Sequence, residues 1–230
     1  MGKVPSRLVA GVFVPLAVAA LASCSQAAPR LVAVSFKLIY RQSGPSYVER
    51  LSCFAFAEDE DGEADLEELR IVNDRAQLYW QLTSQDWVSV SKAGQTWFGS
   101  HTLSMPDGGK IPRGVYRVVL LDKGGERDER TVSFEAPLAS ERAFPSLSFT
   151  EGRYVVSSAY PKNLLVVYGA SGTVLRSVEL SAKAGAIADL SLGQTARSAA
   201  LWAEDEAASV AVLTDPVPLP QGLDEGRRAP

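Results

Sequence analysis

Histidine, methionine and cysteine are scarce in this chain of 230 residues, which has one His, two Met and two Cys. The lone His101 has no second His and no Cys pair to complete a zinc site of the usual kind. No G-x-S-x-G nucleophile elbow occurs either. We therefore predict no catalytic residues, no metal ligands and no cofactor, and take His101 for a histidine on an edge strand or loop.

Excess positive charge and long apolar runs are also missing. Acidic side chains outnumber basic ones by 27 to 23, which gives a net charge of −4. Nucleic-acid binding needs clustered Lys and Arg to neutralise phosphates, so we expect no nucleic-acid partner. The longest apolar stretch, residues 8–22, falls short of the roughly 20 residues that a membrane-spanning helix needs.

That short apolar stretch has the flanks of a secretory signal. Lys3 and Arg7 precede it, and the tetrapeptide Leu-Ala-Ser-Cys that ends at Cys24 follows it. This arrangement resembles the lipobox of bacterial lipoproteins. The resemblance implies cleavage before Cys24, a diacylglycerol on its thiol and an acyl chain such as palmitate on its amine. The alternative is an ordinary signal peptide that is cut nearby, with Cys24 incidental.

We accordingly expect a signal peptide over 1–23 and a lipidated tether over 24–30. Lipid on Cys24 would hold the chain to a membrane of the bacterial cell envelope, on its periplasmic or surface side. Once Cys24 is modified, only Cys53 remains, so no intrachain disulfide can form. Cys53 lies in an apolar run, which predicts a buried and inert thiol.

After the tether, β-branched and aromatic residues recur with a period of two, and turn residues fall every eight to twelve positions. This pattern predicts an all-β chain of two antiparallel modules. We place the first domain at 31–136 and a smaller second domain at 146–215, with a Pro-bracketed linker between them. Residues 84–92 are expected to form a helical turn or loop, and 186–192 a strand. The Pro-rich tail, 216–230, is expected to be disordered.

The segment that begins at Pro112 carries a second resemblance. Gly114 stands two positions before Tyr116 at the start of a predicted strand. This is similar to the tyrosine corner of immunoglobulin-like sandwiches, in which the phenol bonds to an upstream backbone group. Cys53 and Val118 would stand where antibody domains carry their disulfide, and Trp80 would fill the core. The fold class is therefore two tandem β-sandwiches of the immunoglobulin or fibronectin III kind.

The acidic run from Glu58 to Glu68 offers a candidate calcium loop. With Gly62 at the sixth position of an EF-hand, Ala57 occupies the first, where the motif needs a carboxylate. The flanks predict strands and not helices. A solvated turn is the simpler interpretation, and the sequence leaves open whether the turn from Asp59 to Gly62 binds calcium.

Three aromatic residues close together in the sequence, Trp87, Trp97 and Phe98, form a possible binding platform. The alternative is that they belong to the core. The chain resembles uncharacterised lipoproteins of diderm bacteria, of the spirochaete kind. We predict a non-enzymatic binding or scaffolding module whose partner is an envelope protein or a glycan. The alternatives are an accessory carbohydrate- or peptidoglycan-binding lipoprotein and a hydrolase with a cleft of paired carboxylates.

Overall fold

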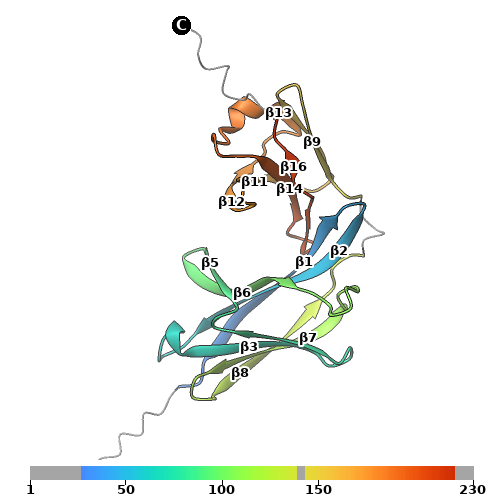
Figure 1. Ribbon diagram of the computed structural model, residues 1–230. Coiled ribbons are helices and arrows are strands. Elements are labelled where there is room, and N and C mark those ends of the chain that lie inside the picture. The colour runs from blue at the N-terminus through green and yellow to red at the C-terminus, as the bar shows by residue number, and fades with distance from the viewer. Residues whose placement is uncertain (1–26, 139–142, 221–230) are drawn as a thin grey trace, which may run out of the picture.

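The computed structural model describes residues 27–138 and 143–220 (Figure 1). These residues form strands, short 3-10 turns and loops, with no α-helix among them. The all-β prediction is therefore confirmed for the described part of the chain. Cys24 and residues 221–230 of the expected tail lie outside the described residues. The start of that tail is not disordered as predicted, because Val217–Pro218 forms a short strand.

Eight strands make up the first half of the molecule, at the bottom of Figure 1. Strands β1, β2, β6 and β5 neighbour one another in that order, and β4, β3, β7 and β8 form a second sheet. The strands are β1 (Arg30–Ser43), β2 (Ser46–Glu58), β3 (Leu66–Asn73), β4 (Leu78–Thr83), β5 (Val88–Lys92), β6 (Gln95–Leu103), β7 (Gly114–Asp122) and β8 (Arg127–Phe134). Phe36 of β1 meets Tyr116 of β7 and Phe134 of β8 edge-on, so the two sheets pack face to face.

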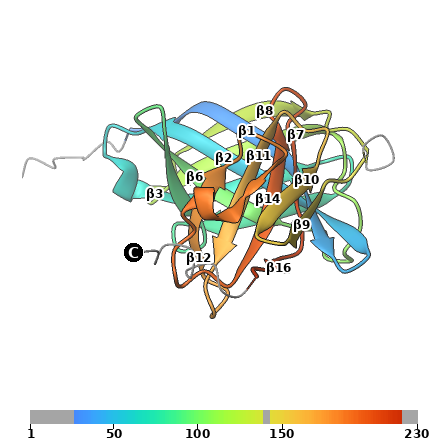
Figure 2. The ribbon, with the colours of Figure 1, turned by 90° about the horizontal axis from the view of Figure 1, so that it is seen from above.

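The described residues of the second half contribute eight further strands. They are β9 (Ser146–Thr150), β10 (Arg153–Ser157), β11 (Lys162–Tyr168), β12 (Val174–Glu179), β13 (Ala184–Ala186), β14 (Ser198–Asp205), β15 (Val210–Leu213) and β16 (Val217–Pro218). Strands β13, β10 and β9 form a three-stranded sheet. Figure 2 shows β9 and β10 beside β11 and β14, whose inward side chains Leu165 and Leu201 are fully buried.

One nine-stranded sheet runs through both halves, because β1 pairs with β2 on one side and with β15 on the other. The pairing of β1 with β2 is antiparallel, and its pairing with β15 is parallel, from Leu38 opposite Val210 to Arg41 opposite Leu213. Backbone hydrogen bonds thus cross the predicted boundary between the modules. The domain boundaries themselves stay a prediction.

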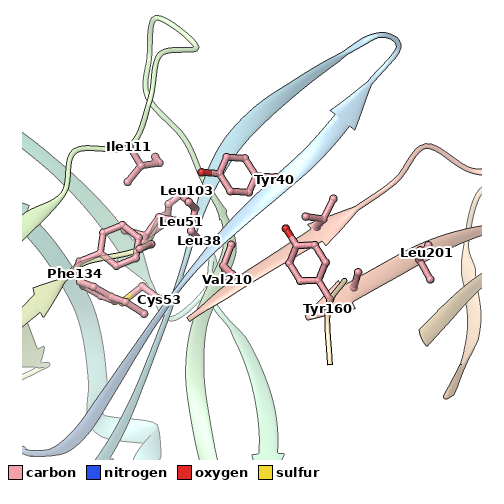
Figure 3. Close-up of a cluster of buried hydrophobic side chains, with 14 of the residues drawn as sticks. Leu38, Tyr40, Leu51, Cys53, Leu103, Ile111, Phe134, Tyr160, Leu201 and Val210 are labelled. Carbon is pink, nitrogen blue, oxygen red and sulfur yellow. The ribbon is translucent and has the colours of Figure 1, made fainter. Parts of the chain in front are cut away.

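The core follows the alternation of side chains along these strands. Figure 3 shows Leu38 and Leu51 beside Cys53 and Val210, all of them fully buried. Burial raises the pKa of the Cys53 thiol well above its usual range. The prediction of a buried cysteine is therefore confirmed.

The tyrosine-corner contact is present. The Tyr116 hydroxyl donates to the Pro112 carbonyl oxygen at 2.7 Å. The Trp80 ring lies parallel to the Tyr116 ring, 6.4 Å away, and its Nε1 donates to the Ser104 carbonyl oxygen at 2.9 Å. Both side chains pack against the core, as their positions in the predicted strands indicate.

Two predicted elements are wrong. Within 84–92 the Asp86 carboxylate accepts hydrogen bonds from Thr83 N and Oγ1, which closes a turn, and the residues that follow pair with β6 as strand β5. Within 186–192 the chain forms a 3-10 turn, Ile187–Leu190, in place of a strand. Ile187 is buried and donates its N–H to Gly152 at 2.8 Å, so burial of one side chain outweighs the alternating pattern.

A largely buried ion pair, which we call the junction pair, lies beside residues 136 and 137 at the end of the first half. The Glu49 carboxylate accepts hydrogen bonds from Arg113 Nη1 at 2.7 Å and from Ile111 N at 2.9 Å. Arg113 Nε also donates to the Ala136 carbonyl at 3.0 Å, and Tyr40 Oη donates to the Pro137 carbonyl at 2.8 Å. Burial, together with the negative charge of Glu49, raises the pKa of Tyr40 to about 12.

Glu49→Gln should destabilise the protein by about 3 kcal/mol, because it leaves the largely buried charge of Arg113 without a counter-charge. Urea denaturation followed by tryptophan fluorescence measures the change. Glu58→Gln is the matched control, since Glu58 pairs with Arg30 in the open and should lose less than about 0.5 kcal/mol. Equal losses in the two variants would contradict the role of the junction pair.

Tyr116→Phe should cost about 1 kcal/mol, because it removes one hydrogen bond from a buried corner while keeping the ring. The same denaturation measurement reports the change. Tyr79→Phe serves as the control, because Tyr79 is 64% exposed. A Tyr116→Phe variant as stable as the wild type would show that the corner bond contributes nothing.

Candidate binding face of the nine-stranded sheet

The nine-stranded sheet has one face turned away from both cores, which we call the outer face. Register and alternation place its side chains. Among them, from β5 to β11, are Val88, Val90, Lys92, Trp97, His101, Ser52, Phe54, Phe56, Lys37, Ile39, Ala211, Trp202, Glu204, Lys162 and Leu164. The face therefore spans strands from both halves of the molecule.

Aromatic and aliphatic side chains gather at the β5 end of the outer face. The Trp97 ring lies 6.0 Å from the Phe56 ring, and Lys92 Nζ lies 5.6 Å from the centre of the Trp97 ring. Val90 stands directly opposite Trp97 on the neighbouring strand. Val88 on the same side is 50% exposed, so apolar surface continues to the edge of the sheet.

The predicted platform of Trp87, Trp97 and Phe98 does not form on one surface. Trp97 and Phe98 are adjacent on β6 and so point to opposite faces of the sheet. Phe98 is 5% exposed and packs on Trp87 at 4.8 Å on the core side. The structure leaves Trp97 alone of the three on the outer face, where Phe56 and Val90 are its neighbours in place of the predicted pair.

Strand β5 is an open edge. Its five residues are all exposed, and it ends the nine-stranded sheet, with β6 as its neighbour. Edge strands present unpaired backbone groups that another chain can pair with. Sequence reasoning missed this strand although valine and small polar side chains alternate along it, which is the pattern of a half-exposed strand.

The middle of the outer face is polar. The Glu204 carboxylate is paired with Lys37, accepts a hydrogen bond from Trp202 Nε1 at 3.2 Å and lies 3.9 Å from Lys162 Nζ. Burial lowers the pKa of Lys37, and the nearby Glu206 partly offsets this effect. These residues come from β1, β14 and β11, so the cluster depends on the β1–β15 pairing and no local sequence signal could reveal it.

His101 also lies on this face, beside a bulge in the pairing of β2 with β6. The prediction that it lies on an edge strand or loop is wrong, because β6 lies between β2 and β5 in the sheet. Its Nδ1 is 3.1 Å from Ser52 Oγ, and its ring lies 4.5 Å from the Phe54 ring. Desolvation and the charge of Lys37 lower the His101 pKa, which favours a neutral ring near pH 7. A Ser–His nucleophile needs a third group that orients the histidine. In the described part of the chain no carboxylate contacts His101, and Ser52 is buried.

Three carboxylates of the first half meet where the loop after β2 lies next to the end of β7. Side-chain oxygens of Asp59, Asp65 and Asp122 lie within 4.8 Å of one another. Asp59 and Asp65 belong to the acidic run that the sequence singles out, whereas Asp122 comes from the end of β7. The sequence could not reveal this third member, because it becomes a neighbour only through the pairing of β3 with β7.

Comparisons with known proteins give little. No protein-family model matches the chain, and no curated protein matches it. Among solved structures the chain is similar to Tp47, the 47-kilodalton lipoprotein of Treponema pallidum, at 12% identity and a TM-score of 0.38. The similarity covers 76% of this chain and 47% of that one, so this chain spans about half the length of that protein. A likeness at this level carries no argument about function.

Within residues 27–138 and 143–220, no helix is long and apolar enough to cross a membrane. Cys24, the predicted lipid carrier, lies outside these residues.

Proposed function

We propose that this protein is a lipid-anchored protein of the bacterial envelope that acts as a non-enzymatic binding or scaffolding module. The anchor rests on the lipobox that ends at Cys24. Each buried methylene contributes about 0.8 kcal/mol, and a single myristoyl chain binds only marginally. Two or three chains on one cysteine would therefore hold the protein at the membrane without any other contact to lipid.

The proposed framework is a pair of immunoglobulin-like sandwiches. In the first half, the strand orders β1-β2-β6-β5 and β4-β3-β7-β8 match the ABED and C′CFG sheets of such domains. The bond from Tyr116 Oη to the Pro112 carbonyl supports the same assignment. In the second half, the small sheet of β13, β10 and β9 would close a smaller sandwich over β11 and β14.

The binding role rests on one observation, the open edge strand β5 with apolar side chains beside it. A partner strand that pairs with β5 would satisfy its free backbone groups and cover Val88, Val90 and Trp97 together. Lys92 over the Trp97 ring and Phe56 at its side leave less of the indole free for a sugar. A protein partner is thus the better match, and a glycan is the second candidate because Trp97 and Phe56 form an aromatic pair on the surface.

Cys24→Ser should abolish the membrane anchor. The wild-type chain should partition into the detergent phase of a Triton X-114 extraction and show the mass of a cleaved, acylated product. The variant should lose the acyl mass and move to the aqueous phase. A variant that still partitions with detergent at unchanged mass would remove the lipoprotein assignment.

Val88→Lys should reduce capture of the partner in cells about tenfold, because it places a charge in the apolar strip at the β5 edge. Crosslinking followed by mass spectrometry measures the yield of the trapped protein. Val115→Lys is the matched control, since Val115 is an exposed valine (59%) on β7 of the other sheet. Equal yields from the two variants would exclude β5 as the docking edge.

A glycan partner has a different signature. Retention on purified peptidoglycan that Trp97→Ala removes and Val88→Lys leaves unchanged would favour the second candidate. Loss of crosslinking with Val88→Lys and no retention on peptidoglycan would favour the protein partner.

A further inference from the structure

The group of Asp59, Asp65 and Asp122 has the arrangement of a cation site (Figure 1, where the loop from β2 to β3 lies beside the start of β1). We propose that these three aspartates bind a calcium ion. The loop after β2 supplies two of the carboxylates and the end of β7 supplies the third, so the ion would join the two sheets of the first half.

Asp122 supplies the observation that separates this group from an ordinary acidic surface. Its side chain is almost completely buried, at 1% exposure. The Oδ1 atom accepts a hydrogen bond from Glu126 N at 2.9 Å, whereas Oδ2 is buried with no hydrogen-bond partner among the described residues. A buried, ionised oxygen without a donor is costly, and a cation would offset that cost.

Asp59 shows the same feature. Its Oδ1 accepts a hydrogen bond from Asp61 N at 2.8 Å, and its Oδ2 is buried without a partner in the described structure. Asp59 and Asp122 thus come from different segments of the chain and share one arrangement. In each, one carboxylate oxygen accepts a hydrogen bond from a backbone N–H, and the other oxygen has no hydrogen-bond partner among the described residues. Asp65, the third carboxylate of the group, comes from the end of the 3-10 turn Glu63–Asp65.

The donor set favours calcium over other divalent ions. All three ligands are carboxylate oxygens, with no His or Cys in the group, which disfavours zinc. The three oxygens lie within 4.8 Å of one another. Two bonds of about 2.4 Å, the length that calcium uses, just span a pair of oxygens at that separation. Magnesium needs shorter bonds and a near-octahedral shell, so we expect it to bind more weakly.

The site differs from the EF-hand loop tested on the sequence. That motif fails because Ala57 occupies its first position, and a linear pattern then predicts no metal. In the structure Asp122, 57 residues beyond Asp65, supplies the missing carboxylate. We therefore revise the prediction that the chain has no metal ligands. Eight of the eleven residues from 58 to 68 are acidic, and they would attract the ion from solution.

The site lies at the end of the module where the tether begins. Ala27 N donates to Asp61 Oδ2 at 2.9 Å, three residues beyond Cys24. On the proposed function, this end faces the membrane. A bound calcium ion would then reduce the negative charge of the loop next to the lipid headgroups.

Calcium titration of the full chain in detergent tests the proposal. We expect a dissociation constant of about 10⁻⁴ M, within the range of extracellular calcium modules. With 10 mM calcium, the melting temperature should then rise by about 5 °C over its value in EDTA. Magnesium at the same concentration should give less than half of this shift. No calcium-dependent shift and no heat in calorimetry, or equal shifts with both ions, would overturn the proposal.

Variants locate the ion. Asp122→Asn should abolish the calcium-dependent shift, yet in EDTA it should melt no lower than the wild type, because the amide removes one charge from the group. Asp59→Asn should behave in the same way and serves if Asp122→Asn does not fold. Glu60→Gln removes the same charge from the same loop outside the group, and it should keep the full shift.

The competing explanation is that Lys123 supplies the positive charge. Its Nζ donates to the Ala64 carbonyl oxygen at 2.7 Å, next to Asp65. If Lys123 neutralises the group, Asp59→Asn and Asp122→Asn will lower the melting temperature in EDTA and calcium will have no effect on the wild type. That result would overturn the calcium site.

Discussion

Strand β1 is the element on which the rest of the structure depends. It runs from Arg30 to Ser43 and pairs with β2 along almost its whole length. Its second half also pairs with β15, which adds the strands of the second half to the same sheet. Because a shared sheet holds its strands through backbone hydrogen bonds, the two halves cannot rotate freely about the connecting segment, as domains joined by a flexible linker would. The outer face and its Lys37–Glu204 pair exist only because of this pairing.

Other contacts protect the same strand at both ends. Near its start, Leu31 N donates to Asp128 Oδ2 at 2.7 Å, which attaches β1 to β8 of the opposite sheet. Near its end, Tyr40 takes part in the buried network of Glu49 and Arg113. Phe144 stacks on Tyr47 at 3.7 Å, so the chain that enters the second half is held against the β1–β2 hairpin. These contacts explain how a parallel pairing between distant segments, which costs loop-closure entropy, is retained.

Local patterns in the sequence predict local parts of the fold. Alternation over 47–57 and 114–122 predicts β2 and β7, and the spacing of Gly114 and Tyr116 predicts the corner bond. The turn at Gly169–Gly172 joins β11 to β12, as its residues indicate. The candidate sites have a different origin. Phe56 becomes a neighbour of Trp97, and Asp122 becomes a neighbour of Asp59, through the registers between strands. A register depends on the whole sheet and not on either residue.

Asp122 shows why a buried charge distinguishes a site from a surface. An acidic turn such as 58–63 needs only water to solvate its carboxylates, and exposure would serve it best. Asp122 instead follows the core residues Val118 and Leu120 on β7, where an apolar or neutral side chain would avoid the cost of desolvation. Its Oδ1 accepts a backbone hydrogen bond, whereas its Oδ2 has no hydrogen-bond partner among the described residues. A cation shared with Asp59 gives that second oxygen a function, which the hydrogen bonds of the loop alone do not provide.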